Sequence, residues 1–252
     1  GAEEAEALGR EARLLGRVDH PHVVRLCGFV NSGVLRCDGK AQRVSYALLE
    51  YAPHGEVFAA LQRAGALCPA AARLLGQQLL QALAHLHAAG IAHRDVKLEN
   101  ILLDGNCALK LIDFGFGALR LLGATSDTFL GSEGYLPPEV LTRRPYDVFK
   151  ADVFSAGVVL FSLAVGHPPF AEARAADPFF RAFAASPERF WREHTRRAGR
   201  TVPAALRALA TGMLAPQPSQ RLTAAQALQS EWLSGPIDEV EAVAELRRLT
   251  ST

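Results

Sequence analysis

The hydrophobic pattern divides the chain into two unlike parts. Residues 3–18 place apolar side chains at helical spacing and predict a helix, which Pro21 should end because the residue before proline avoids the helical conformation. Two β-rich runs follow, at 22–30 and 44–51. They predict a hairpin whose strands are joined by a long polar connection.

After Pro53 the pattern becomes mostly helical, interrupted by short strands at 91–112 and by an irregular stretch at 114–138. The expected helices are 56–64, 70–89, 138–141, 148–165, 179–189, 203–213, 223–229 and an amphipathic tail at 237–249. An α+β fold follows, with a small β-containing part and a large helical part. We place the parts at 1–52, 53–235 and 236–252, and expect the tail to be a capping extension rather than a docking helix.

Composition narrows the function classes. The 252 residues include 27 basic and 26 acidic side chains, and this balance argues against nucleic-acid binding and against a polybasic membrane anchor. The apolar run 153–165 is too short for a membrane span, and no signal-type segment is visible. The four scattered cysteines indicate reduced thiols. We therefore expect a cytoplasmic protein, with the nucleus as the alternative location. We also expect the protein to be monomeric.

The segment 93–100, His-Arg-Asp-Val-Lys-Leu-Glu-Asn, carries the strongest chemical signal. Asp113-Phe114-Gly115 follows thirteen residues after Asn100. Phosphoryl transfer needs one carboxylate to orient a hydroxyl and accept its proton, and a second to hold Mg²⁺ beside a neutral oxygen ligand. Asp95, Asp113 and Asn100 fit these three tasks. Either motif alone is an ordinary turn or charge cluster; their joint spacing is what indicates the chemistry.

These motifs are similar to the signature set of protein kinases, and the resemblance runs from residue 1 to about residue 235. It implies a two-lobe kinase-like fold with an incomplete small β lobe and a mainly helical large lobe. It implies that Asp95 is the catalytic base and that Lys97 is the cation on the transferring phosphate. Asn100 and Asp113 would be the metal ligands, and Arg94 would receive a phosphate from the activation loop.

The same resemblance implies ATP and Mg²⁺ as cofactors and a protein as the substrate. Lys97, two residues after Asp95, resembles serine/threonine rather than tyrosine kinases. Leu98 resembles the calcium/calmodulin-dependent and AMP-activated-like branch. The expected activity is transfer of the γ-phosphoryl group of ATP to serine or threonine hydroxyls.

Three further residues match structural positions of the family. Glu139 resembles the glutamate that pairs with a distant buried arginine, and Arg221 matches that arginine. Asp152 opens an apolar helix, where a carboxylate favours the helix N-terminus, and in the family the matching aspartate also anchors the catalytic loop. The alternative for Glu139 and Arg221 is two unrelated surface charges, which contribute little to stability.

The resemblance also implies an activation segment, residues 113–139, and a nucleotide pocket. Thr128 resembles an activating phosphosite, and Ser132 resembles the hydroxyl residue that contacts the catalytic aspartate and lysine. The stretch 46–52 resembles the strand and hinge that receive adenine. Within this stretch the resemblance implies Leu49 as the gatekeeper and the backbones of Glu50 and Ala52 as hydrogen-bonding partners of adenine. Outside it, Glu56 would contact the ribose and Leu102 would lie under the adenine.

Glu11 resembles the helix glutamate that pairs with a lysine on an upstream strand. Ten residues precede Glu11, none of them lysine, and the chain has no G-x-G-x-x-G loop. We expect a truncated kinase. The second hypothesis is a catalytically silent pseudokinase or scaffold, and the third is a small-molecule phosphotransferase of kinase-like fold. The hairpin of residues 22–51 should expose an unpaired strand edge, which predicts poor stability.

Overall fold

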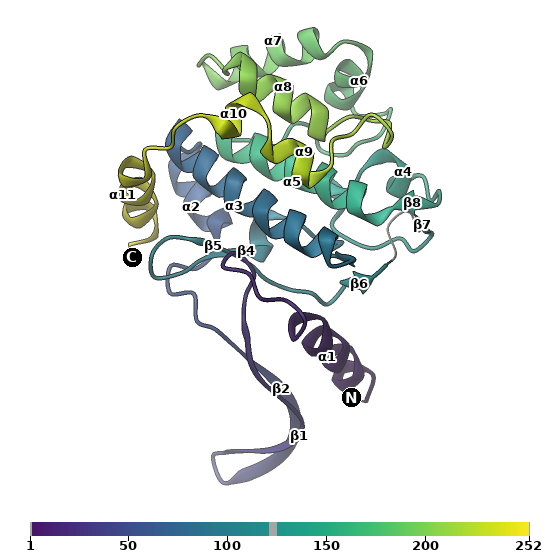
Figure 1. Ribbon diagram of the computed structural model, residues 1–252, viewed down its shortest axis with the longest axis vertical. Coiled ribbons are helices and arrows are strands. Elements are labelled where there is room, and N and C mark those ends of the chain that lie inside the picture. Colours follow the sequence, from purple (N-terminus) through teal and green to yellow (C-terminus); the bar gives the residue numbers. More distant parts are fainter. Residues whose placement is uncertain (1, 121–124, 252) are drawn as a thin grey trace.

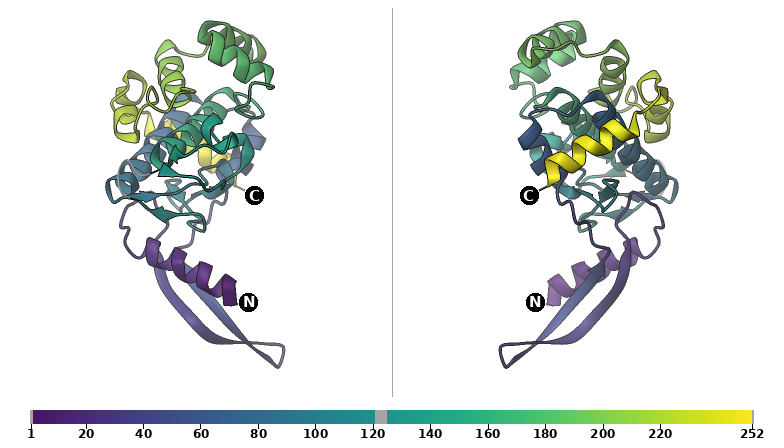
Figure 2. Two further views of the ribbon diagram at one scale, coloured as in Figure 1. Left: turned by 90° about the vertical axis from the view of Figure 1, so that its right-hand side faces the viewer. Right: turned by 90° about the vertical axis from the view of Figure 1, so that its left-hand side faces the viewer.

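The computed structural model describes residues 2–120 and 125–251 and confirms the α+β prediction (Figure 1). A helix and a two-stranded hairpin form the small part at one end of the long axis. A helical body forms the rest. Most of its short strands lie where the two parts meet, and one pair, 125–126 with 146–147, lies at the side of the body. The views of Figure 2 show the hairpin extending away from this body.

Helices make up most of the body, and α1 lies with the hairpin. Their bounds are α1 Ala2–Leu15, α2 Val57–Ala64, α3 Pro69–Ala88, α4 Pro138–Leu141, α5 Val148–Val165, α6 Pro178–Ala185, α7 Pro187–Ala198, α8 Ala204–Met213, α9 Ala224–Leu228, α10 Glu231–Ser234 and α11 Glu239–Thr250, with short 3-10 turns η1 Leu98–Asn100 and η2 Glu133–Tyr135.

The strands form four antiparallel pairs: β1 with β2, β3 with β6, β4 with β5, and β7 with β8. Their bounds are β1 Leu26–Cys37, β2 Lys40–Leu49, β3 Ile91–Ala92, β4 Ile101–Leu103, β5 Leu109–Leu111, β6 Ala118–Leu119, β7 Thr125–Ser126 and β8 Tyr146–Asp147.

The hairpin differs from its prediction, because its connection is short. Cys37 pairs with Lys40 across a two-residue turn, Asp38-Gly39, whose φ angles are 51° and 75°. Asp-Gly favours such a turn because both central residues must take positive φ. The polar stretch near residue 31 lies inside β1, where the register shifts between Val30 and Gly33.

Helices α3 and α5 form the centre of the core (Figure 1). Asp147 caps α5 by accepting hydrogen bonds from the backbone nitrogens of Phe149 and Lys150, at 2.9 and 3.2 Å. By length and composition α5 could cross a membrane, but 89% of it is buried inside the protein. The surrounding helices therefore account for its apolar sequence, as expected of a core helix.

The predicted helix 179–189 is two helices. Ser186 and Pro187 break it, because the residue before proline is driven to extended backbone and Ser186 has φ −158° and ψ 101°. Ser186 then caps α7 by accepting a hydrogen bond from the backbone nitrogen of Arg189 at 3.4 Å. The break turns α7 away from the line of α6 and places a separate helix at the end of the molecule opposite the hairpin (Figure 1).

The tail folds as α11 along one side of the body, beside α2 and α3 (Figure 2). Ala242 and Leu246 are fully buried there. The side chain of Glu245 accepts a hydrogen bond from the backbone nitrogen of Cys68 at 2.8 Å. The tail is thus packed against the helical body.

Candidate active site

Asp95 lies at the centre of the candidate site and is 5% exposed. Its Oδ2 atom accepts hydrogen bonds from Nζ of Lys97 at 2.6 Å and from Nδ2 of Asn100 at 3.0 Å. Its Oδ1 atom accepts bonds from the backbone nitrogen and the hydroxyl of Ser132, at 3.1 and 3.0 Å. Charge-assisted hydrogen bonds of this kind fix the direction of a carboxylate, so Asp95 is positioned to orient a hydroxyl group.

Lys97 extends this network. Its ammonium group contacts both the Asp95 carboxylate and, at 3.0 Å, the hydroxyl of Ser132. The catalytic loop and the activation segment are therefore joined through one cation and one carboxylate. The sequence placed Ser132 in contact with Asp95 and Lys97, and the structure brings these three side chains together.

Asn100 connects the catalytic loop to the segment that carries Asp113. Its amide nitrogen donates to the backbone oxygen and to the carboxylate of Asp95, at 2.9 and 3.0 Å. The backbone nitrogen of Ile112 donates to the backbone oxygen of Asn100 at 2.9 Å, and Asp113 follows directly. The bonds to the amide nitrogen fix which end of the Asn100 side chain is the oxygen available as a ligand.

This donor set fits Mg²⁺. Asp113 has a positive φ of 65°, is exposed, and uses Oδ1 to accept the backbone nitrogen of Gly115 at 3.1 Å. One carboxylate and one neutral amide oxygen are hard donors of the kind that Mg²⁺ takes from proteins, with phosphate oxygens completing the set. Across residues 2–120 and 125–251, no group of three or more His, Cys, Asp or Glu side chains could hold a metal by itself.

Asp152 anchors the catalytic loop from the first turns of α5. It is 1% exposed, and its carboxylate accepts the backbone nitrogens of His93 and Arg94 at 2.9 and 2.7 Å. His87 contacts the same carboxylate through Nε2 at 3.0 Å. Arg94 has a positive φ of 70°, a strained conformation that these bonds hold in place.

His93 packs under the site as a neutral ring. Burial lowers its pKa, and Nε2 lies 2.9 Å from the backbone oxygen of Ile112. Nδ1 accepts the backbone nitrogen of Asp95 at 3.3 Å, so Nε2 carries the hydrogen. The ring also meets Phe114 edge-on with centroids 4.7 Å apart. His93 thus contacts both the catalytic loop, at Asp95, and the Asp-Phe-Gly segment, at Phe114.

Arg94 is half-buried, and part of its guanidinium group is enclosed by protein. Its Nε and Nη2 atoms make no hydrogen bond within the described residues. Tyr146 and Leu130 line the small hollow beside it. Thr128 has an exposed side chain, and its backbone oxygen accepts the Tyr146 hydroxyl at 2.9 Å. Residues 121–124 of the activation segment lie outside the described part of the chain.

Glu139 and Arg221 form a bidentate ion pair, with N–O distances of 2.7 and 3.1 Å. Arg221 is 1% exposed and donates further to the backbone oxygens of Lys150 and Ala215, at 2.9 and 3.0 Å. Its guanidinium also lies 4.9 Å from the ring centroid of Phe154. The pair is therefore buried, and the alternative of two separate surface charges is wrong.

The predicted nucleotide contacts lie along the junction of the two parts. Glu56 bridges to Leu102, which brings the expected ribose and adenine contacts side by side. The Glu50 carboxylate is bound by Nζ of Lys110 at 3.0 Å and by the backbone nitrogen of Arg25 at 2.8 Å. The backbone nitrogen of Glu50 donates to Arg25.

Leu49 is exposed and Ala52 is half-buried near the junction. Leu49 is 42% exposed, and the Ala52 carbonyl accepts the backbone nitrogen of Gly55 at 3.3 Å. Since the Glu50 nitrogen is already bonded, its carbonyl is the group left for a base at that position.

Glu11 reaches the candidate site from α1. Its Oε1 atom accepts the backbone nitrogen of Phe114 at 3.1 Å. Burial raises the pKa of Glu11, and the neighbouring Asp113 adds to the rise. Within the described residues, Glu11 thus contacts the Asp-Phe-Gly segment directly.

Sequence reasoning missed some neighbours of the site. The Tyr135 hydroxyl donates to Glu99 at 3.3 Å, and burial together with Glu99 raises the pKa of Tyr135. Nothing in the local pattern around Tyr135 indicates this bond, because its partner is 36 positions away.

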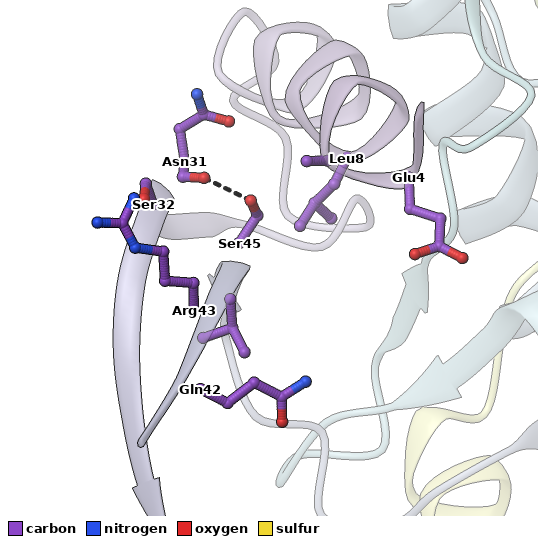
Figure 3. A pocket seen from close by; sticks show the side chains of 9 residues that line it. Glu4, Leu8, Asn31, Ser32, Gln42, Arg43 and Ser45 are labelled. Carbon is purple, nitrogen blue, oxygen red and sulfur yellow. Dashed lines mark hydrogen bonds between the residues drawn. The ribbon is translucent and has the colours of Figure 1, made fainter. Parts of the chain in front are cut away.

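A separate hollow of about 390 Å³ lies between α1 and the hairpin, where Leu8 faces Ser45 and Gln42 (Figure 3). None of the predicted site residues lines it.

Comparison with known proteins gives a consistent picture. CBL-interacting protein kinase 22 of Oryza sativa subsp. japonica is 38% identical over 234 residues, covering 89% of this chain and 48% of the relative. CBL-interacting serine/threonine-protein kinase 18 of Arabidopsis thaliana is 42% identical over 165 residues, covering 64% of this chain and 30% of the relative. Serine/threonine-protein kinase kin-29 of Caenorhabditis elegans is 37% identical over 163 residues, with 65% and 19% covered.

The chain spans half or less of the length of these relatives. The sequence model of the protein kinase domain matches residues 1–233, which include all the predicted site residues. This match shows the kinase-like α+β fold, with a small strand-containing part and a helical part. The chain belongs to the protein kinase domain family.

Proposed function

We propose that the protein transfers the γ-phosphoryl group of ATP to serine or threonine hydroxyls of a protein substrate. The observation that carries this proposal is the network around Asp95, in which Lys97 and Ser132 hold the carboxylate and Asn100 links it to the Asp113 segment. A silent binding module has no need for a base, a cation and a metal-ligand set in one network.

In the proposed reaction Asp95 accepts the proton of the substrate hydroxyl. The hydroxyl oxygen forms a bond to the γ-phosphorus, the bond from that phosphorus to the bridging oxygen breaks, and ADP leaves. Lys97 lies beside Asp95, where its positive charge would face the transferring group. Such a positioned base contributes about 10²–10⁴-fold to a rate, and electrostatic stabilisation is the other main contribution to phosphoryl transfer.

Asn100 and Asp113 would hold Mg²⁺ through their side-chain oxygens. The ion, when bound, neutralises charge on the phosphates. Glu11 would support this arrangement by fixing the backbone of Phe114. For the nucleotide we propose Leu49, Glu50 and Ala52 at the adenine edge, with Glu56 at the ribose and Leu102 below the base.

Activation is proposed to depend on phosphate at Thr128. Arg94 is half-buried, and its Nε and Nη2 atoms are buried without a hydrogen-bond partner among residues 2–120 and 125–251. Leaving enclosed polar atoms of a cation unpaired is costly. A phosphate group offers three strong acceptor oxygens to such an arginine and orders the loop that carries it.

The test uses the full-length protein and radiolabelled ATP with a serine-containing and a tyrosine-containing peptide. Asp95→Asn and Asp113→Asn are expected to lower transfer to serine by at least about 100-fold. Thr128→Ala and Arg94→Ala should each lose the activated rate while keeping the basal rate.

Glu231→Gln is the matched control, because Glu231 is an exposed carboxylate on α10 and the substitution removes one charge without touching the site. It should leave transfer unchanged. Equal transfer by the wild type and Asp113→Asn would refute the metal-ligand assignment, and transfer to tyrosine alone would refute the acceptor class.

We infer that the protein acts on proteins as a monomer in the cytoplasm, away from membranes and nucleic acid, consistent with its net charge of +1. The names of several plant relatives describe them as CBL-interacting. By similarity we propose that the full protein binds a regulatory protein in addition to its substrate.

A further inference from the structure

The end of the molecule formed by α6 and α7 carries a concentrated positive charge. Residues 181–200 contain six arginines and two glutamates, whereas the whole chain has a net charge of +1. All six arginines are exposed. We call them the α7 arginine surface: Arg181, Arg189, Arg192, Arg196, Arg197 and Arg200.

Half of this surface has no ion-pair or hydrogen-bond partner for its side chains in the part of the chain that the structure describes. Arg196 pairs with Glu193 at 2.5 Å, and Arg197 lies 6.0 Å from the ring centroid of Phe179. Arg200 donates to a backbone oxygen, that of Ala164. Arg181, Arg189 and Arg192 make no ion pair and no side-chain hydrogen bond to the described residues. Like charges clustered in this way repel one another, and an external anion would relieve the repulsion.

A groove runs between the two helices at the centre of this surface. Its volume is about 320 Å³. Phe179 and Ala182 of α6 and Phe190 of α7 form the apolar part, and Arg189 and Arg192 line the α7 side. Because these two arginines are three residues apart on one helix, they lie on the same face. The groove can thus take an apolar side chain while the arginines bind acidic groups beside it.

The shape and chemistry of the groove favour a protein segment over other anions. Arginine binds carboxylates through two parallel hydrogen bonds, which gives directional recognition. A membrane surface is bound by apolar side chains that project outward, but Phe190 is fully buried and Phe179 half-buried. Phe179 and Ala182 give the groove an apolar part that a side chain of a protein segment would cover and a phosphate backbone would leave uncovered. Glu193 also lines the groove but pairs with Arg196, so Arg189 and Arg192 supply the charge for an acidic group.

The groove is connected to the candidate active site by the segment between α5 and α6. Pro168 and Ala171 of that segment line a second, mostly apolar hollow of about 360 Å³ together with Gly134 and Tyr135 of the activation segment. Gly134 follows two residues after Ser132, which contacts Asp95.

We propose that the α6–α7 groove is a docking site for an acidic segment of the protein substrate, with glutamate or aspartate residues around one apolar side chain. Docking at a second place raises the local concentration of the acceptor at Asp95 without any new contact there. The role in substrate choice rests on the proposed kinase function, whereas binding of the acidic segment does not.

The binding test uses the full chain and a fluorescein-labelled peptide of glutamates around a single phenylalanine, followed by fluorescence anisotropy. The wild type should bind, and the affinity should fall as salt is added, because exposed charges are screened. Arg189→Glu/Arg192→Glu should weaken binding by at least about tenfold, because it replaces attraction by repulsion. The same peptide with alanine for phenylalanine should bind more weakly to the wild type.

Arg36→Glu/Arg248→Glu is the matched control, with the same charge change on exposed residues of β1 and α11. It should bind like the wild type. Equal loss in both double variants would overturn the proposal, and so would tighter wild-type binding to phosphatidylserine vesicles or to single-stranded RNA than to the peptide. If the glutamate variant melts early, Arg189→Ala/Arg192→Ala replaces it, with weakened binding still expected.

A kinetic test separates docking from catalysis. A serine peptide joined by a flexible linker to the acidic segment should show a lower KM than the serine peptide alone, with the same kcat. Arg189→Glu/Arg192→Glu should abolish this difference and leave kcat unchanged. Peptide binding without phosphate transfer would refute the proposed kinase function and keep the docking site. Transfer with no effect of the acidic segment on KM would refute its role in substrate choice.

Discussion

At the scale of single residues, Arg221 shows how a large cation can be held away from water. Its side chain is fully buried, and Glu139, two backbone oxygens and the ring of Phe154 surround it. Burying a charge is costly unless a counter-ion and hydrogen bonds compensate for it. Glu139 follows Pro138 at the start of α4, so this ion pair fixes the end of the activation segment to the helical body.

Glu139→Gln should therefore lower the free energy of unfolding by about 3–5 kcal/mol, because Arg221 would lose its counter-ion while staying buried. Urea unfolding followed by circular dichroism measures this. Glu139→Gln/Arg221→Met should recover part of the loss, since no buried charge then remains.

The control is Glu6→Gln, which removes an ion pair of the same length, 2.7 Å, with Arg10. That pair is exposed on α1, so its loss should change the free energy by less than about 1 kcal/mol. Equal effects of the two substitutions would contradict the role of burial.

At the scale of elements, helix ends decide how neighbouring segments meet. Gly166 ends α5 with a φ of 93°, and a Cβ atom there would lie 2.1 Å from the backbone oxygen of Gly65. The backbone nitrogen of Leu67 donates to the Leu163 oxygen at 3.0 Å in the same place. The end of α5 is thus pressed against the connection between α2 and α3, and glycine is the residue that fits.

Gly166→Ala should lower the free energy of unfolding by about 3 kcal/mol, since the strain of positive φ adds to a clash with fixed backbone. Gly199→Ala is the matched control: Gly199 ends α7 with a φ of 64° and has no atom within 4 Å of the added Cβ. It should cost about 1 kcal/mol. Thermal and urea unfolding would compare the two, and similar losses would show that the contact with Gly65 is unimportant.

At the scale of the whole molecule, α11 extends the structure beyond the residues matched by the kinase family, 1–233. Its Leu249 carbonyl accepts a hydrogen bond from Arg63 of α2. The Thr250 hydroxyl lies 3.1 Å from Nδ1 of His54, two residues before Glu56. Helix α11 therefore supports the segment on which the proposed ribose contact depends.

Leu246→Ala in α11 should lower the free energy of unfolding by about 2–5 kcal/mol, because a fully buried leucine is replaced by a cavity. Val240→Ala, at a position that is 82% exposed on the same helix, should change it by less than about 0.5 kcal/mol. Chemical denaturation measures both. A small effect at Leu246 would mean that α11 is only loosely attached to α2 and α3.

Much of the fold and of the candidate site could be predicted from the sequence, because short segments of the chain carry the signals for them. Asp95, Asn100 and Asp113 stand at fixed spacings in short motifs, so their proximity follows from the sequence. Helix α5 spans the predicted residues, because a continuous apolar pattern is bounded by a capping Asp147 and a terminal Gly166. The Asp38-Gly39 pair and Pro187 are local signals for a turn and for a helix break. The spacing of apolar residues, from which the strand and helix bounds were predicted, does not include such signals.

The sequence by itself determined the fold class, the family and the residues of the proposed chemistry, because these depend on short-range periodicity and motif spacing. The tertiary structure decided which groups lack partners and which surfaces adjoin. Folding leaves two nitrogens of Arg94 without a partner among the described residues, brings Glu11 to Phe114 and forms the groove between α6 and α7. Such features depend on the packing of distant segments, and no local pattern encodes that packing.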